Sequence, residues 1–204
     1  MDVAITNTGL SCPIKDFTRE SRPVRDPMRL SELSDKILAE FGSILHQVDE
    51  ESAEKLVEGI LSSERIFLVG MGRSGLVARF FAMRLMQIGL QVYVVGDVTT
   101  PAIGKGDLLI AISGSGETKT THHIASLAKS LSARVFLLTI QTKSRIANIS
   151  DLVIVLPDSP QPILPLRSAF EGAAHIFLDA VVILLMRKAG VTQREMMERH
   201  SNLE

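Results

Sequence analysis

Apolar residues recur along this chain with two different spacings. In the region of residues 31–62 they return every three or four positions, and this apolar stripe includes Leu30, Leu33, Ile37, Leu38, Phe41 and Ile44. This spacing predicts amphipathic helices, and a second stretch of the same kind covers residues 53–61. From residue 65 onward, short continuous apolar runs replace the helical pattern. We therefore expect a helical start followed by a region that contains strands.

Five continuous apolar runs predict five strands, and shorter helical patterns separate most of them. The strands are expected at residues 65–69, 91–95, 107–112, 134–139 and 152–156. The helices between them are expected at residues 76–88, 119–131 and 144–149. Runs without polar alternation indicate strands buried on both faces, as in a parallel sheet. The pattern therefore predicts an α/β fold: a five-stranded parallel sheet, doubly wound and flavodoxin-like, flanked by helices.

The two ends of the chain differ in character. A long helix at about residues 168–189 and a short one at 193–200 are expected to close the domain, after a proline-rich loop at 157–165. Residues 1–28 are polar, carry three prolines and show no clear period. We expect them to form an N-terminal extension or loosely packed arm, ahead of one domain over residues 29–204.

Composition narrows the class of protein. The chain has 204 residues, of which 46% are hydrophobic, and a formal net charge of −1, which argues against a nucleic-acid partner. The single cysteine, Cys12, fits a reducing compartment. The start of the chain does not read as a secretory signal, and the longest apolar stretch, residues 176–186, is interrupted by Asp179 and shorter than the roughly 20 residues of a membrane span. We expect a cytoplasmic protein without a membrane partner.

A glycine-rich turn follows the first predicted strand. Residues 70–75 read Gly-Met-Gly-Arg-Ser-Gly, which matches the dinucleotide fingerprint between a strand and a helix, and Asp97 follows the second strand. A nicotinamide-dependent oxidoreductase is therefore one interpretation. Asp97 lies further along than the usual spacing of about 20 residues. The chain also leaves little room for a separate substrate domain, and a second phosphate-type turn follows the third strand. We therefore favour a different ligand.

The second turn, which we call the phosphate turn, covers residues 113–118 and precedes a helix. Its two glycines let the backbone approach a ligand, and free N–H groups at a helix start favour an anion. A simple helix cap needs only one hydroxyl, whereas this turn has three, so we favour a site for a phosphate ester. The predicted phosphate-binding residues are Ser113, Gly114, Ser115, Gly116 and Thr118.

Together, the strand ends resemble a known family. The sequences Gly-Met-Gly-Arg-Ser-Gly, Gly-Asp-Val-Thr-Thr-Pro and Ser-Gly-Ser-Gly-Glu-Thr are similar to those of the sugar isomerase (SIS) family of phosphosugar isomerases and phosphosugar-binding domains. Residues 81–86, 99–101 and 199–204 more narrowly resemble members that interconvert D-arabino-3-hexulose 6-phosphate and D-fructose 6-phosphate in the ribulose monophosphate pathway of formaldehyde assimilation. The resemblance runs from about residue 30 to the end. Leu166 and Arg167 depart from the Met-Gly that it leads us to expect.

The resemblance implies a catalytic site. It assigns Glu171 as the base and His200 as the second acid–base group, in a tail that reaches another subunit's site. From the residues alone, Glu171 could equally complement a helix dipole, and His200 would read as a surface residue. Moving a carbonyl between C3 and C2 through a cis-enediol(ate) needs a base and a proton shuttle, but no metal and no cofactor. The further substrate-binding candidates are Gly72, Arg73, Ser74, Thr99 and Thr100.

The resemblance also implies partners, and other functions remain open. It implies a homotetramer with active sites at subunit interfaces and a functional pairing with hexulose-6-phosphate synthase. One alternative is a phosphosugar isomerase that acts on a pentose or heptose phosphate. Another is a non-catalytic phosphosugar sensor, although such regulators usually carry a DNA-reading module, for which the residues before the first helix are too few and not basic enough. The oxidoreductase is the third.

Overall fold

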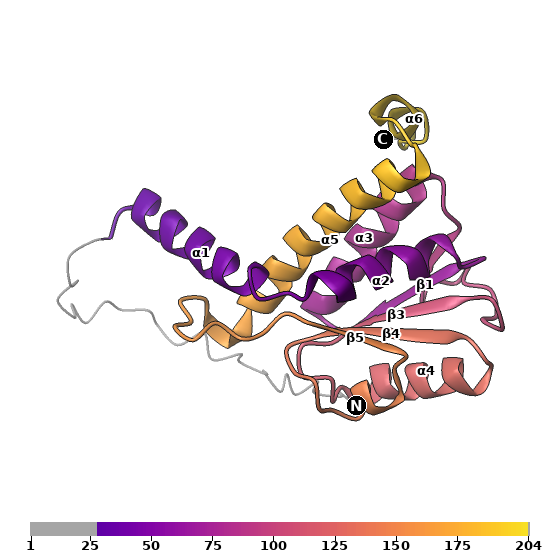
Figure 1. Cartoon of the computed structure of the whole chain (residues 1–204), viewed down its shortest axis with the longest axis horizontal. Coiled ribbons are helices and arrows are strands. Elements are labelled where there is room, and N and C mark those ends of the chain that lie inside the picture. Colours follow the sequence, from indigo (N-terminus) through magenta and orange to yellow (C-terminus); the bar gives the residue numbers. More distant parts are fainter. Residues whose placement is uncertain (1–27, 204) are drawn as a thin grey trace, which may run out of the picture.

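A computed structural model of the protein describes residues 28–203. Cys12 and all but the last residue of the expected N-terminal extension lie outside the described residues. Within them, a five-stranded parallel sheet is flanked by helices on both faces, which confirms the predicted α/β fold (Figure 1).

The sheet has the strand order β2-β1-β3-β4-β5, which is the doubly wound order of flavodoxin-like proteins. In the register of the sheet, Gly70 lies opposite Ile112, and Ile112 lies opposite Leu138. The carboxyl ends of β1, β3 and β4 therefore meet at one edge. The strands are β1 (Ile66–Gly70), β2 (Val92–Val94), β3 (Leu108–Ile112), β4 (Arg134–Thr139) and β5 (Leu152–Val155).

Helices form a layer on each face of the sheet. The layer of α2, α3 and α5 covers one face and α4 the other, while α1 extends beyond the sheet (Figure 1). The six α-helices of the described residues are α1 (Leu30–Leu45), α2 (Glu50–Leu61), α3 (Arg73–Ile88), α4 (Lys119–Ser130), α5 (Ala169–Ala189) and α6 (Gln193–Glu198). Two short 3₁₀ turns, η1 (Ala147–Ile149) and η2 (Pro165–Arg167), lie in the loops.

The helical region expected at residues 31–62 is two helices. The break lies at residues 46–49, where Asp49 caps α2 by accepting a hydrogen bond from the Ser52 N–H at 2.9 Å. The helix expected at residues 144–149 shortens to the single turn η1. The other predicted helices lie where the sequence places them, with ends shifted by a few residues.

The apolar runs are buried on both faces of the central strands. Every residue of β3 is buried, as expected of a strand between two helical layers. One hydrophobic cluster lies between the sheet and α2, α3 and α5, and a second lies between the sheet and α4. The edge strand β2 is only half-buried and shorter than the run that predicted it.

The helix α5 is the main helix of the layer formed by α2, α3 and α5. Together with the turn before it, it is the single helix of the described residues that is long and apolar enough to cross a membrane, with a mean hydropathy of 1.8. Half of that stretch is buried inside the domain. Because α5 packs against α1, α2 and α3, it is the core helix of this domain.

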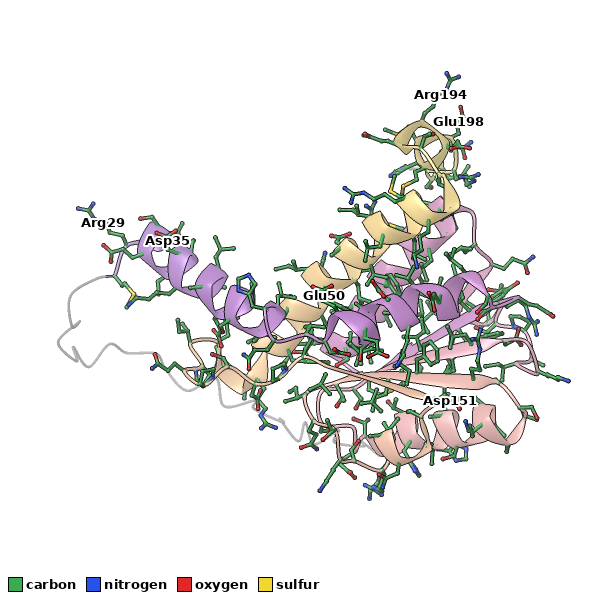
Figure 2. The ribbon with its side chains drawn as sticks, in the orientation of Figure 1. Arg29, Asp35, Glu50, Asp151, Arg194 and Glu198 are labelled. Carbon is green, nitrogen blue, oxygen red and sulfur yellow. The ribbon has the colours of Figure 1, made fainter. Side chains whose placement is uncertain are left out.

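The first half of α1 leaves the body of the domain. Arg29 and Asp35 mark this end in Figure 2, far from the sheet. Leu30 and Leu38, which belong to the predicted apolar stripe, are 81% and 62% exposed, whereas Ile44 near the end of α1 is buried. Only the C-terminal half of α1 therefore packs against the core of its own chain.

Two helix glycines give a matched test of the packing. A Cβ at Gly42 in α1 would meet nothing within 4 Å, whereas one at Gly59 in α2 would lie 2.2 Å from the buried ring of Phe136. Gly42→Ala should raise the free energy of unfolding by about 0.5–1 kcal/mol through helix propensity. Gly59→Ala should lower it by about 1–3 kcal/mol through overpacking. Urea unfolding of both variants checks this, and equal effects would contradict the packing described.

Candidate active site

The first glycine turn brings the start of α3 directly against the end of β1. Gly72 has φ +57° and ψ −131°, a backbone conformation that favours glycine. A Cβ at Gly75 would lie only 2.7 Å from the carbonyl oxygen of Gly70, so the helix and the strand approach as closely as backbones allow. This turn places Arg73 and Ser74 as the first two residues of α3, at the shared edge of the sheet.

Glu171 lies in the first turn of α5, and its carboxylate meets both of these residues. Arg73 Nε donates to Glu171 Oε2 at 3.2 Å, and Ser74 Oγ donates to Oε1 at 3.2 Å. The side chain of Glu171 is 17% exposed, so the carboxylate is shielded but open to a ligand. Each oxygen keeps further acceptor capacity beside its one bond, so the carboxylate can still take a proton.

The phosphate turn leaves several donors without a partner. Its hydroxyls are used locally: Ser113 Oγ pairs with Thr118 Oγ1 at 3.2 Å, and Ser115 Oγ accepts from the Glu117 N–H at 3.2 Å. Thr118 is the N-cap of α4, yet its side chain makes no capping bond. Within the described chain, the N–H groups of Gly114, Ser115 and Thr118 find no acceptor. This supports the anion-site interpretation of the turn over the simple cap.

The loop after β4 packs against the phosphate turn and holds it in place. Gly116 has φ +63°, and a Cβ there would lie 2.1 Å from Ser144 Oγ, so only glycine fits. Arg145 Nε donates to Glu117 Oε2 at 2.6 Å, and this bond holds the pKa of the Glu117 carboxyl below its ordinary value. A carboxyl with a lowered pKa stabilises the fold above its ordinary pKa, and the contribution is lost as the pH falls through the lowered value.

The carboxylate and the phosphate turn lie next to each other. Phe170, the residue before Glu171, packs on Gly114: a Cβ there would lie 3.1 Å from Phe170 Cδ1. Phe170 is itself buried. The start of α5 thus carries one residue that contacts the phosphate turn and one that contacts the first turn. The predicted group of Arg73, Ser74, Glu171 and the phosphate turn therefore comes together at one edge of the sheet.

Thr99 and Thr100 lie in the loop after the edge strand β2. Thr100 Oγ1 donates to the carbonyl of Val94 at 2.7 Å, and both threonines line a hollow of about 220 Å³ against α3. Asp97, the acidic residue of the dinucleotide interpretation, is bound by Arg79, with Nη2 to Oδ1 at 2.7 Å. In the part of the chain that the structure describes, neither threonine hydrogen-bonds to Glu171 or to the phosphate turn. The Asp97–Arg79 pair leaves the carboxylate less free to accept from a ribose.

His200 does not meet Glu171 within one chain. It is exposed, follows α6, and its Nδ1 lies 3.1 Å from the carbonyl of Ser201. Figure 1 shows α6 beyond the C-terminal end of α5, whereas Glu171 lies in the first turn of α5; Arg194 and Glu198 mark α6 in Figure 2. At 1.5 Å per residue, the length of α5 separates the two groups by roughly 27 Å. A hollow of about 430 Å³ lies beside His200, between α3, α5 and α6.

Several features of the site have no signal in the sequence. Arg73 Nη2 donates to the carbonyl of Leu166 at 2.9 Å, and both Leu166 and Arg167 have φ +57° although neither is glycine. A backbone carbonyl acts independently of its side chain, so no motif predicts this contact. The departure of these two residues from the expected Met-Gly was the sign in the sequence that the backbone here has an unusual geometry. In the part of the chain described here, no group of three or more His, Cys, Asp or Glu could hold a metal ion.

Comparison with known proteins gives consistent relatives. The chain is 43% identical to a 3-hexulose-6-phosphate isomerase of Bacillus subtilis over 185 residues, which cover 87% of this chain and all of that protein. It is 39% identical to a 3-hexulose-6-phosphate isomerase of Mycobacterium gastri over 165 residues, covering 78% of this chain and 83% of that protein.

A solved structure agrees with these sequences. A protein of Methanococcus jannaschii, for which a molecular function of 3-hexulose-6-phosphate isomerase was inferred, superposes with a TM-score of 0.78 at 35% identity. The match covers 85% of this chain and 99% of that one. Residues 59–184 match the model of the SIS domain. They include both glycine turns and Glu171, so the chain belongs to the SIS domain family.

Proposed function

We propose that this protein is a 3-hexulose-6-phosphate isomerase, which interconverts D-arabino-3-hexulose 6-phosphate and D-fructose 6-phosphate. The observation that carries the proposal is the carboxylate of Glu171, held by Arg73 and Ser74 beside a turn whose backbone donors find no acceptor in the described part of the chain. A phosphate site next to an oriented carboxylate suits proton abstraction from a sugar phosphate. The names of the relatives support the choice of substrate.

The reaction divides between the turn and the carboxylate. The phosphate of the substrate binds the N–H groups of the phosphate turn at the start of α4. Glu171 removes the proton from C2, which gives a cis-enediol(ate) between C2 and C3, and a proton is then returned to C3. A second group must move a proton between the two oxygens. This sequence balances with acid–base chemistry alone.

His200 is our candidate for the second group, supplied by another subunit. An imidazole ring has one nitrogen that can donate a proton and one that can accept a proton, which suits this transfer. The roughly 27 Å along α5 means that a His200 from the same chain is too far away. We propose a homotetramer with its active sites at subunit interfaces. Exposed apolar side chains on α1 and α5 support such an assembly, among them Leu30, Leu38, Ile183 and Leu184.

We also propose a setting for this activity. The protein acts in the cytoplasm, in formaldehyde assimilation through the ribulose monophosphate pathway. Its functional partner is hexulose-6-phosphate synthase, which supplies the substrate. The net charge of −1 and the half-buried α5 are consistent with a soluble enzyme that binds neither nucleic acid nor membrane.

One assay separates the proposal from its alternatives. The substrate is generated from formaldehyde and ribulose 5-phosphate by the partner synthase, and formation of fructose 6-phosphate is followed. We expect turnover without added nicotinamide. Isomerisation of pentose phosphates instead would assign a different phosphosugar isomerase, and binding of sugar phosphate without any turnover would assign a sensor.

Glu171→Gln should lower kcat by about 10²–10⁴-fold, because the amide keeps the shape of the carboxylate but takes no proton. Binding of fructose 6-phosphate, measured by calorimetry, should remain. Asp179→Asn is the matched control, since Asp179 lies on the same helix and its carboxylate pairs with Arg84 at 3.3 Å. Normal kcat in Glu171→Gln, or an equal loss in Asp179→Asn, would contradict the assignment of the base.

Gly116→Ala should abolish phosphate binding, since a Cβ there meets Ser144 and the left-handed backbone strains any other residue. The readout is the dissociation constant of inorganic phosphate and of fructose 6-phosphate. Gly104→Ala is the control, because a Cβ at Gly104 has no atom within 4 Å. Unchanged affinity in a folded Gly116→Ala protein would show that phosphate binds elsewhere.

Mixing of subunits tests the role of His200. Glu171→Gln and His200→Ala should each be inactive when expressed alone. If each site takes Glu171 from one chain and His200 from another, co-expression of the two variants should restore part of the activity, because some sites then carry both intact groups. Fructose 6-phosphate formation by the mixed oligomer is measured against the separate variants. Failure to complement, with oligomers formed, would contradict shared sites.

A further inference from the structure

Glu40 is a buried charged residue that plays no part in the site described above. Its side chain, near the middle of α1, is 4% exposed. Oε2 accepts hydrogen bonds from the backbone N–H groups of Ile163 at 3.2 Å and Leu164 at 3.3 Å, whereas Oε1 has no partner among the described residues. A carboxylate is costly to bury unless it is hydrogen-bonded. These two bonds therefore fix the loop before α5 to α1.

The backbone just beyond this anchor is strained. Leu166 and Arg167 both have φ +57°, in the left-handed region that favours glycine. Such non-glycine residues cost on the order of 1–3 kcal/mol each and persist only where their surroundings hold them. The N–H groups bound by Glu40 hold the turn on one side. The ion pair of Arg167 with Asp158 at 2.6 Å holds it on the other.

The strained turn connects directly to the base. The carbonyl of Leu166 accepts from Arg73 Nη2 at 2.9 Å, and Arg73 Nε donates to Glu171 at 3.2 Å. The planar guanidinium has its donors in fixed directions, so the Leu166 carbonyl sets the direction in which Nε points. A shift of the loop would therefore move the bond that orients the carboxylate of Glu171.

Phe41, the residue after Glu40, packs against the first turn of α5, on the other side of the strained turn. A Cβ at Gly172, the residue after Glu171, would lie 2.4 Å from the ring of Phe41. The glycine thus allows α1 to rest directly on the first turn of α5. Two adjacent residues of α1 therefore contact both sides of the strained turn. Glu40 binds the loop before it, and Phe41 packs on the helix after it.

We propose that Glu40 is a positioning residue for Glu171, which acts through the loop at residues 163–166 and Arg73. The inference deepens the proposed function and rests on Glu171 as the base. Glu40 touches neither substrate nor reacting atoms. It fixes the Leu166 carbonyl, and so the geometry of the Arg73–Glu171 bond.

Glu40→Met tests the proposal, because it keeps the length and the apolar stem but removes the acceptor. We expect kcat to fall by about 10–100-fold, the effect of a small misplacement of a catalytic group, with KM unchanged. Glu40→Gln should keep kcat near that of the wild type, since its carbonyl oxygen can accept both N–H groups. Glu40→Asp, which is too short to reach the loop, should behave like Glu40→Met and replaces it if that variant does not fold.

Two controls separate positioning from general destabilisation. Val57→Ala removes buried volume in α2, away from the loop, and should lower stability without lowering kcat. In an Arg73→Met background, Glu40→Met should cause no further loss of kcat, because the path through Arg73 is already broken. An equal loss in both backgrounds, or wild-type kcat in Glu40→Met and Glu40→Asp, would overturn the proposal.

A crystal structure of Glu40→Met tests, without an activity assay, whether Glu40 positions Glu171. The proposal requires the Leu166 carbonyl to leave Arg73 and the Arg73–Glu171 bond to change. If both contacts stay as in the wild type, Glu40 is not a positioning residue, whatever the activity. Absence of turnover in the wild type, by contrast, would overturn the proposed function. The crystal structure alone would then decide whether Glu40 fixes the Arg73–Glu171 contact.

Discussion

The carboxylate of Glu171 joins the helix that follows the first strand to the helix that follows the last strand. It accepts from Arg73 and Ser74 at the start of α3, 98 and 97 residues earlier in the chain. Since α3 follows the first strand and α5 follows the last, these bonds can form only when the sheet between them is complete. The pairing of α3 with α5 along the same layer brings the groups into range. The candidate site is therefore a product of the whole fold.

The two glycine turns serve the site in different ways. The first allows the closest approach of α3 to β1, and so fixes where Arg73 and Ser74 begin. The second leaves backbone N–H groups at the start of α4, beside Phe170, without an acceptor among residues 28–203. The first turn has the form of a dinucleotide motif, yet in this protein it lies beside α5 and forms one side of the candidate site, whose other sides are the phosphate turn and α5.

The sequence was informative where burial controls the structure. Continuous apolar runs predicted the central strands β1, β3 and β4 well, because central parallel strands are buried on both faces. The runs also placed the edge strands β5 and β2, although β2 is shorter than the run that predicted it. The stripe on α1 predicted burial at Leu30 and Leu38 that a single chain does not provide.

The pattern of apolar residues could not predict the finer geometry of the site. The pairing of Glu171 with Arg73 and Ser74 depends on contacts across nearly half the chain, which spacing does not encode. The bond to the Leu166 carbonyl involves a backbone group that every residue carries. The family resemblance could point to Glu171 and His200, and the structure places nearly the whole length of α5 between them.

Hydrogen exchange into the substrate tests the central claim most directly. Fructose 6-phosphate is incubated with the protein in D₂O and followed by proton NMR. If Glu171 acts as the base between C2 and C3, deuterium should enter at C3, the C1 protons should remain, and Glu171→Gln should show no exchange. Exchange at C1, exchange that survives in Glu171→Gln, or no exchange with the wild type would contradict the account.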